Sequence, residues 1–510
     1  MLRKCFVALV TAAAASSTAI AAEPVKGPTS SQPAYVTPTA PGWTATSLIT
    51  TGDGAEQNGY RMVGNPDGLG VIGGAWSPTL RKYTQPDQYM TVFMNHELPL
   101  DAGIARAHGK PGAFISQWTV ELGTLRVVQG QDLIQRVMTW NNTTKTYQET
   151  TGQTAFDRFC SGDLPKPTAF RDPASGKGFA GRLYLNGEEA AFAGRAFAHV
   201  ISGTQKGTTY ELPYFGKSAW ENILAHPSSG LQTVVVALND AAPGQVYVYV
   251  GTKQATGNPV ERAGLQGGKL YGIRVTDGGA LYHGSAVSVE DAGPINGGRF
   301  TLVDVSAYAL ASGTVLETKS DEAGITQFAR PEDGHWDPTD PRAFYFVVTG
   351  TTGTSAQTAR LYRLRFDSTT WPVGGAIDLM VDSSTLVGTD GKIAKSFDNI
   401  TVSSNGTVLV EEDPGNDAYL GKTWKIKPVN PPAAVQVAKS NPDFFLSGGT
   451  NFHTQTEESS GIVDVTTLVR PASWFQSTRR YYLANMMDHS VSHDLELYRG
   501  GQLYLISGPP

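Results

Sequence analysis

The stretch Gln245-Val246-Tyr247-Val248-Tyr249-Val250-Gly251 alternates valine and tyrosine over the length of a whole strand. β-Branched and aromatic residues of this kind favour extended strands. An apolar run at residues 233–238 precedes it, and Pro243-Gly244 lies between the two runs. Two such runs on either side of a proline–glycine turn predict a β-hairpin.

Related strand patterns recur at residues 269–274, 343–348, 360–365 and 502–505, without a fixed period. Repeated sheets with insertions of variable length are typical of a β-propeller. We therefore expect an all-β, single-domain β-propeller with irregular insertions; a pair of β-sandwiches or a β-barrel is the alternative. Helical periodicity is scarce, and residues 218–224, which begin at a potential serine cap, are expected to form one short helix.

Composition agrees with a turn-rich β protein. The 510 residues include 57 glycines and 30 prolines, and only 17% are charged. Residues 1–21 have the features of a Sec-type signal peptide: Arg3 and Lys4, an apolar stretch, and Ala19-Ile20-Ala21 as the cleavage site. We expect an irregular N-terminal arm at 22–42, a propeller domain at 43–510, and a periplasmic or extracellular location.

Net charge limits the possible partners. The chain carries −6, and loss of Arg3 and Lys4 with the signal peptide makes this −8. There is no basic stripe, so we expect no nucleic-acid partner. No stretch is long enough to predict a membrane span. An acidic protein that handles an anionic substrate needs cations at its site, and metal ions can supply them.

One cysteine remains after signal-peptide removal, because Cys5 lies within that peptide. Cys160 is therefore an inert core residue, an exposed reactive thiol or a metal ligand. Its neighbours Arg158 and Asp163 suit a functional loop better than a core strand. Short acidic runs lie elsewhere in the chain, at residues 95–97, 186–189, 330–333 and 397–399. If the fold gathers these runs around the thiol, the site can hold metal ions.

Familiar catalytic motifs are absent from the sequence. It has no histidine pair with zinc-protease spacing, no Gly-x-Ser-x-Gly elbow and no P-loop. Asp413, Asn416 and Asp417 do not have the spacing of an EF-hand loop. The acidic runs therefore have to be judged as a set.

As an ordered set, these segments resemble the PhoX-type alkaline phosphatases over most of the mature chain. The segments that carry the resemblance are residues 65–70, Met94-Asn95-His96-Glu97, Phe159-Cys160-Ser161-Gly162, Asn186-Gly187-Glu188-Glu189, Asn239-Asp240, Arg330-Pro331-Glu332, residues 397–400, residues 457–462 and residues 500–503. The resemblance implies a propeller of about six blades, a cluster of iron and calcium ions (Fe3+ and Ca2+), and secretion. It also implies hydrolysis of phosphate monoesters by a monomer that binds a small phosphorylated substrate.

The resemblance also implies roles for individual residues. Cys160 corresponds to an iron ligand, and Arg330 to the catalytic guanidinium that grips the phosphate. The carboxylates implied as metal ligands are Glu97, one of Glu188 and Glu189, Asp240, Glu332 and Asp398. The family's His-Glu pair is His226-Pro227 here, so Glu221 is a candidate replacement, and the family's next acidic pair is reduced to Asn239-Asp240. These departures put the full number of metal ions in doubt.

Other functions fit the same residues. One is a propeller hydrolase of phosphodiesters, phytate or lactones. Another is a non-catalytic, calcium-stabilised propeller that binds glycans or proteins. The plainest is a secreted β protein whose acids are scattered over its surface. The interpretation as a metal site depends on whether distant loops bring Cys160 and the carboxylates into one cavity.

Overall fold

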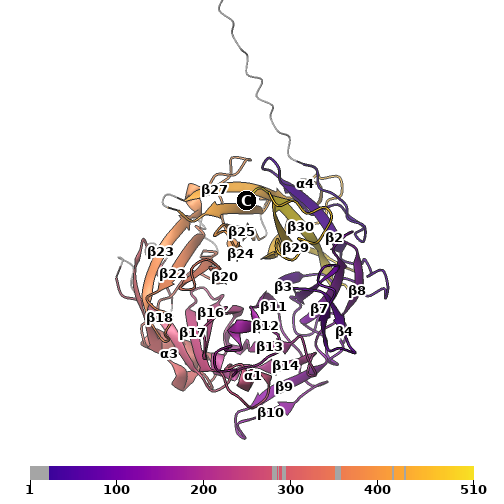
Figure 1. The fold of residues 1–510 in the computed structure, drawn as a ribbon. Helices are drawn as coiled ribbons and strands as arrows, with labels where there is room; N and C mark the ends of the chain where they lie inside the picture. Colours follow the sequence, from indigo (N-terminus) through magenta and orange to yellow (C-terminus); the bar gives the residue numbers. More distant parts are fainter. Residues whose placement is uncertain are drawn as a thin grey trace, which may run out of the picture.

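The protein is a β-propeller whose blades surround a central channel (Figure 1). The computed structural model describes residues 22–277, 284, 286–289, 295–350, 358–415, 418–429 and 432–510, so the signal-peptide prediction for 1–21 lies outside the described residues. In the described part of the chain, six strands contact one another in a closed ring around the channel: β3 (Pro66–Gly73), β11 (Phe159–Asp163), β15 (Trp220–Ala225), β20 (Pro331–Trp336), β24 (Phe397–Val402) and β28 (Glu457–Asp464).

Each ring strand is the innermost strand of one blade, and the inner strands follow the chain order around the ring. Blade 1 continues from β3 into β6 (Tyr89–His96), β7 (Phe114–Glu121) and β8 (Val127–Asp132). Blade 2 continues from β11 into β12 (Leu183–Glu188), β13 (Ala196–Val200), β14 (Thr208–Glu211), β9 (Arg136–Asn141) and β10 (Thr146–Glu149). Blade 3 continues from β15 into β16 (Gln232–Asn239), β17 (Val246–Thr252) and β18 (Lys269–Val275). The described strands within the blades pair antiparallel, except for the parallel pair of β14 and β9 in blade 2.

Blades 4 to 6 complete the ring. Blade 4 contains β20, β21 (Ala343–Val348), β22 (Arg360–Phe366) and β23 (Gly375–Asp382), and β19 (Gly298–Asp304) joins β23 to β18 of blade 3. Blade 5 contains β24, β25 (Val408–Glu412), β26 (Lys422–Lys427), β27 (Ala433–Ser440) and β1 (Val36–Pro38). Blade 6 contains β28, β29 (Arg480–Val491), β30 (Arg499–Gly508) and β2 (Thr44–Thr50).

The two ends of the described chain close the ring. Strand β2, from the start of the chain, pairs antiparallel with β30, from its end, over Thr44↔Ser507 to Thr50↔Gln502. Strand β1, inside the arm predicted at 22–42, forms the outer edge of blade 5 by pairing with β27. Blade 6 is thus built from both ends of the sequence.

The predicted hairpin is confirmed, and its alternation explains the packing. Strands β16 and β17 pair from Gln232↔Thr252 to Leu238↔Val246. Tyr247 and Tyr249 of β17 belong to one buried cluster, while Val246, Val248 and Val250 belong to another. Successive side chains of a strand point to opposite faces, so an alternating strand of two apolar residue types fills the space on both sides of its blade. The other predicted strands fall within β18, β21, β22 and β30.

The predicted helix at 218–224 is wrong. Residues 220–225 form β15, and all of them are buried. The strand pairs with β16 and contacts β11, β12 and β20, so neighbours on every side outweigh the weak helix preference of a short segment. Among the described residues the α-helices are short: α1 (Pro259–Arg262), α3 (Gly313–Glu322) and α4 (Pro442–Phe445).

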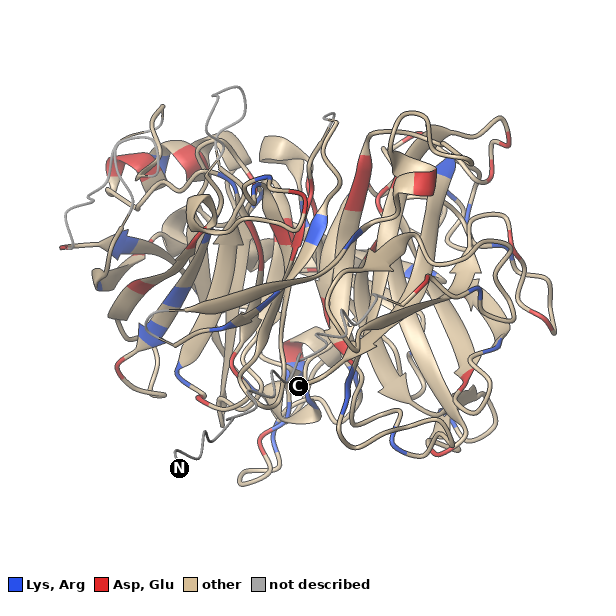
Figure 2. Ribbon diagram, turned by 90° about the horizontal axis from the view of Figure 1, so that it is seen from above, with Lys and Arg blue, Asp and Glu red and all other residues tan. Residues whose placement is uncertain are grey.

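A small hairpin of β4 (Ala75–Ser77) and β5 (Lys82–Thr84) lies outside the blades. The side view shows the blades standing next to one another with loops projecting at both ends (Figure 2). Among the described residues, no helix combines the length and the apolar character that a bilayer crossing demands.

Candidate metal centre

Chain topology brings two sets of side chains to the same end of the channel. In an antiparallel hairpin the first strand begins where the second one ends. The beginnings of the inner strands carry Asp67, Cys160, Glu221, Glu332, Asp398 and Glu458. The ends of the second strands are followed by Glu97, Glu189, Asp240 and Asp413, and in blade 6 the second strand carries His489.

A local irregularity recurs near the beginning of every inner strand. The pairing register shifts between Pro66 and Leu69 in β3 and around the corresponding residue in β11, β15, β20 and β24. In β28 the shift comes later, between Ser459 and Gly461. A bulge of this kind leaves a residue unpaired and redirects its side chain. In four blades a residue with positive φ stands two positions before the functional side chain: Asn65, Arg158, Arg330 and Ser396. The bulge and the residue with positive φ before it therefore direct these side chains into the channel.

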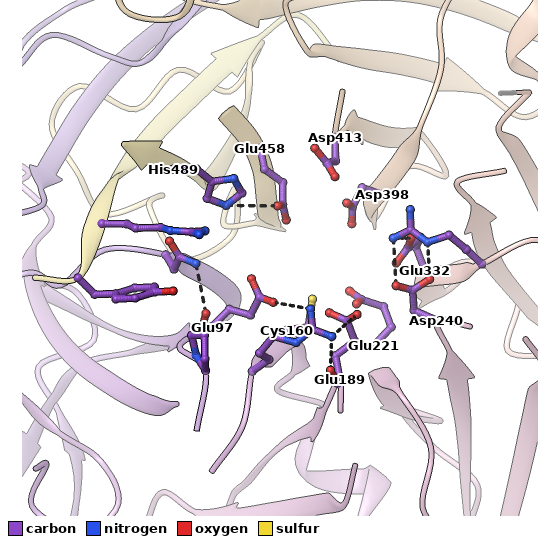
Figure 3. Close-up of a pocket in the computed structure, with 16 residues that line it drawn as sticks. Glu97, Cys160, Glu189, Glu221, Asp240, Glu332, Asp398, Asp413, Glu458 and His489 are labelled. Atoms are coloured by element: carbon purple, nitrogen blue, oxygen red, sulfur yellow. Dashed lines mark hydrogen bonds and ion pairs between the residues drawn. The ribbon is translucent and has the colours of Figure 1, made fainter. Parts of the chain in front are cut away.

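The result is a cavity of about 320 Å³ at this end of the channel (Figure 3). Its carboxylates are Glu97, Glu189, Glu221, Asp240, Glu332, Asp398, Asp413 and Glu458. The other lining residues are Asn65, Pro99, Arg158, Cys160, Arg330, His489, Tyr498 and Arg499. Eight carboxylates and a thiol thus face three arginines.

The electrostatics of the cavity favour cations. Burial raises the pKa of Glu97 and of Glu221 to about 7. Burial also raises the pKa of the Cys160 thiol, and the charges of Asp67 and Glu221 raise it further. Without cations, these groups hold protons because their negative charges are buried together. A bound metal ion reverses this effect, because it stabilises the ionised ligand.

The donor atoms have the spacing of metal ligands. One oxygen each from Glu189 and Glu221 and the sulfur of Cys160 lie within 4.8 Å of one another, as do oxygens of Glu221, Glu332 and Asp398. The first group, with its thiolate, suits a transition metal, and the second, made only of carboxylates, suits calcium. Glu221 belongs to both groups, so it can bridge two ions.

Asp67 supplies a further test of fit. It lies beneath the cavity, fully buried, and its Oδ2 atom has no hydrogen-bond partner among the described residues. Burial raises the pKa of Asp67, and the charges of Glu221 and Glu97 add to the increase. A buried carboxylate oxygen without a donor is costly, and a cation held between Asp67 and the cavity carboxylates would remove that cost.

Two of the three cavity arginines are held in place by carboxylates that line the cavity. The Nε and Nη2 atoms of Arg330 donate to Asp240 at 2.8 and 3.0 Å, and Nη2 lies 2.8 Å from Glu332 Oε1. Arg158 Nη2 donates to Glu189 Oε1 at 2.8 Å, and its Nη1 lies 3.6 Å from Glu97 Oε1. The bidentate pair with Asp240 fixes the plane of the Arg330 guanidinium. Its Nη1 makes no hydrogen bond with the described residues.

The cavity floor is a polar layer. Ser161 Oγ lies 2.6 Å from Glu221 Oε1 and 3.0 Å from Asn399 Oδ1. Asn399 Nδ2 donates to Asp398 Oδ1 at 2.9 Å. These contacts orient Glu221 and Asp398 from below. Beyond the floor, the channel widens into a second cavity of about 530 Å³ with largely apolar walls.

The structure brings together nearly all the residues predicted from the sequence. Those that line the cavity are Glu97, Cys160, Glu189, Glu221, Asp240, Arg330, Glu332 and Asp398. Of the pair Glu188 and Glu189, only the second lines it. Neighbouring strand residues face opposite ways, and Glu188 is paired with Arg195 at 2.6 Å outside the cavity.

His226 also lies outside the cavity. Its Nε2 is 2.7 Å from the carbonyl oxygen of Pro341, and its ring packs against Trp336. Pro227 lines the second cavity, whereas Glu221 lines the one that holds the carboxylates.

Sequence reasoning missed Asp67, Asp413, Glu458, His489 and Arg499. A signal was present for Asp67, because Asn65-Pro66-Asp67-Gly68 has the same order as Arg330-Pro331-Glu332-Asp333-Gly334. Asp413 follows a buried strand just as Glu97 does, but the sequence analysis considers it only as an EF-hand residue. Asn416 and Asp417 lie outside the described residues. His489 and Arg499 have no comparable signal in the sequence.

Comparison with known proteins gives a structural match without a sequence match. No family model and no curated protein matches the sequence. Among solved structures, PhoX of Pseudomonas fluorescens in complex with vanadate, a transition-state analogue, matches with a TM-score of 0.58 and 11% identity. The match covers 96% of this chain and 97% of that one. The chain has the fold of PhoX.

The shared fold thus extends over nearly the whole chain. The apocarotenoid oxygenase of Synechocystis matches with a TM-score of 0.32 at 12% identity, over 88% of this chain and 90% of that one. A similarity that low carries no argument. At 11% identity the match to PhoX shows a shared fold. The chemistry of the site depends on this chain's own residues.

Proposed function

We propose that the protein is a secreted, metal-dependent hydrolase of phosphate monoesters. The observation that carries this proposal is the juxtaposition of Arg330 with two groups of metal-ligand atoms in one cavity. Phosphoryl transfer depends on positioning and on cations that offset the charge of the phosphoryl oxygens. The PhoX structure was solved with vanadate, a transition-state analogue, which supports a phosphoryl group as the ligand of this type of cavity.

The metal ions proposed for the site are calcium and iron. Glu221, Glu332 and Asp398 would hold calcium, and Cys160 with Glu189 and Glu221 would hold iron. When bound, these ions supply Lewis acidity and an activated oxygen nucleophile. All of these ligands except the partly exposed Glu189 are buried, which would limit competition from bulk water.

Arg330 is the proposed catalytic residue for substrate binding. Asp240 and Glu332 hold two of its nitrogens, so its guanidinium needs little reorganisation when the phosphate arrives. Its pKa is raised by Glu332 and Asp240 against the opposing effect of burial, and it stays protonated at alkaline pH. The side chain remains 24% exposed, enough for a substrate to reach it.

The size of the cavity favours small monoesters. A volume of about 320 Å³ lies at the lower end of the range for small-molecule sites. A phosphodiester must place a second ester group where the carboxylates crowd the phosphate. We therefore expect monoesters to be hydrolysed in preference to diesters.

The test uses the purified mature chain loaded with calcium and iron. We expect it to hydrolyse p-nitrophenyl phosphate at alkaline pH, to lose activity in a strong chelator and to regain it when metals return. Bis(p-nitrophenyl) phosphate measures the diester reaction in parallel. Full activity in protein shown by elemental analysis to be metal-free would refute the proposal, as would no hydrolysis by fully loaded protein.

Export is part of the proposal. Residues 1–21 have the composition of a signal peptide, and a site rich in carboxylates benefits from the calcium available outside the cytoplasm. We expect mass spectrometry of the protein from culture fractions to show a mature N-terminus near residue 22. Uncleaved protein confined to the cytoplasm would contradict export.

A further inference from the structure

The three arginines of the cavity differ in their partners. Arg330 is held by Asp240 and Glu332, and Arg158 by Glu189, as described above. The guanidinium of Arg499 makes no ion pair or hydrogen bond with the described residues. It lies over the ring of Tyr498, 5.2 Å from the ring centroid. Arg499 is therefore the cavity arginine whose donors are free for a ligand.

Arg499 lies apart from the proposed metal ligands. The two ligand groups come from blades 2 to 5, whereas Arg499 is the first residue of β30 in blade 6. Burial dominates the pKa of Glu97 and of His489, and the charge of Arg499 acts on both. Figure 3 shows these two residues across the cavity from Asp240 and Glu332. Arg499 thus belongs to the wall that faces Arg330.

This separation decides which part of a substrate Arg499 can reach. A phosphoryl group that contacts the metal ions and Arg330 lies against blades 2 to 5. The rest of the ester then extends toward the side lined by blades 1 and 6, where the lining residues are Asn65, Glu97, Pro99, Glu458, His489, Tyr498 and Arg499. Among these described residues Arg499 is the arginine that can attract an anion.

The charge of the cavity lining indicates which leaving groups Arg499 can favour. The lining contains eight carboxylates and three arginines, so an anionic leaving group would be repelled unless a cation is reserved for it. A neutral leaving group gains nothing from a guanidinium that it cannot pair. We propose that the preferred substrates are phosphate monoesters whose leaving group carries a second anion, a carboxylate or a phosphate, and that Arg499 binds this anion. The inference rests on the proposed function.

Matched esters test this preference. 4-Carboxyphenyl phosphate and 4-carbamoylphenyl phosphate differ in charge but scarcely in size, and 1,3-propanediol bisphosphate with n-propyl phosphate provides the corresponding phosphate pair. Since a charge-assisted hydrogen bond typically changes affinity by about tenfold or more, we expect the anionic member of at least one pair to have a kcat/KM at least about tenfold higher, mainly through a lower KM. The pair that shows it identifies the second anion.

Variants locate the effect. Arg499→Gln should lower kcat/KM for the preferred anionic ester by about tenfold and for its neutral counterpart by less than about threefold; Arg499→Lys should keep part of the preference. Arg61→Gln is the matched control, because Arg61 pairs with Asp494 and Glu496 and does not line the cavity. It removes the same charge nearby and should change both members of a pair alike.

A binding measurement separates this inference from the proposed function. Calorimetry with the non-hydrolysable 4-carboxyphenyl and 4-carbamoylphenyl phosphonates, and with the 1,3-propane bisphosphonate and n-propyl phosphonate, reports the preference without turnover. If loaded protein hydrolyses no ester, the proposed function fails and these affinities alone decide the inference. Equal affinities within both pairs, or a preference that survives Arg499→Gln, overturns it.

Discussion

Glu221→Gln should have opposite effects on stability with and without metal. Glu221 is buried, belongs to both ligand groups and accepts a hydrogen bond from Ser161. Glutamine keeps the shape and can still accept that hydrogen bond, but it removes the negative charge. In chelator the change removes a buried negative charge, whereas in calcium it removes a metal ligand.

The size of the effect follows from the pKa of Glu221. Burial raises this pKa from 4.5 to about 7. A carboxyl group with a raised pKa in the folded state favours folding below pH 4.5, and this contribution is lost as pH rises through about 7. Above that pH the penalty is about 3 kcal/mol.

Thermal unfolding in chelator and in calcium is the assay. For a chain of this length the unfolding entropy is about 1 kcal/mol per degree, so at pH 8 the variant's Tm in chelator should rise by about 3 °C. At pH 5 the gain should largely vanish, because Glu221 is then protonated in the folded protein. In calcium at 1,000 times its Kd the wild type gains about 4.1 kcal/mol, which exceeds the gain of about 3 kcal/mol from the substitution, so a variant that binds no calcium should unfold about 1 °C below the wild type.

A control separates the metal site from ordinary burial. Glu188→Gln neutralises another buried glutamate, but Glu188 is paired with Arg195 outside the cavity. We expect it to lower Tm by a similar amount in chelator and in calcium. If Glu221→Gln also lowers Tm equally in both, the cavity carboxylates do not form a metal centre and the reasoning fails.

Three further predictions concern single residues. Arg330→Ala should lower kcat for p-nitrophenyl phosphate by about 100-fold or more with an unchanged circular dichroism spectrum; an unchanged rate would remove Arg330 from the mechanism. Cys160→Ser should abolish bound iron in elemental analysis while calcium remains, because the alcohol is a poor ligand for the softer metal; retained iron would show that the thiolate is not a ligand. His226→Gln should leave the metal content unchanged and lower the free energy of unfolding by about 1–2 kcal/mol, since His226 only packs and hydrogen-bonds outside the cavity; loss of metal would contradict its placement.

The strands were predictable because their signal is local. The alternation at 245–251 identifies a strand buried on both faces, and β17 is such a strand. The segment at 218–224 misled because it is short and carries Ala219, Glu221 and Leu224, which also suit a helix. Only its neighbours in blades 2 to 4 make it a strand, and those contacts cannot be seen in the segment itself.

The site was predictable where a residue type and its neighbours recur. Cys160, Glu332 and Asp398 each stand in a short run whose order marks the beginning of an inner strand. The choice between Glu188 and Glu189 depends on where β12 ends, and a shift of one residue reverses the side-chain direction. Arg499 could not be predicted, because its proposed role depends on its place in the cavity and on its lack of an ion pair with the described residues.

The pairing of β2 with β30 has a consequence for assembly. Strand β2 is synthesised long before β30, its partner in blade 6, so this blade cannot be completed until β30 has been made. The mutually repelling acids contributed by all the blades then converge late, after most of the hydrophobic interior has formed. Metal ions bound among these acids would offset the repulsion. We expect the residues that line the channel to have low local stability until the ions bind.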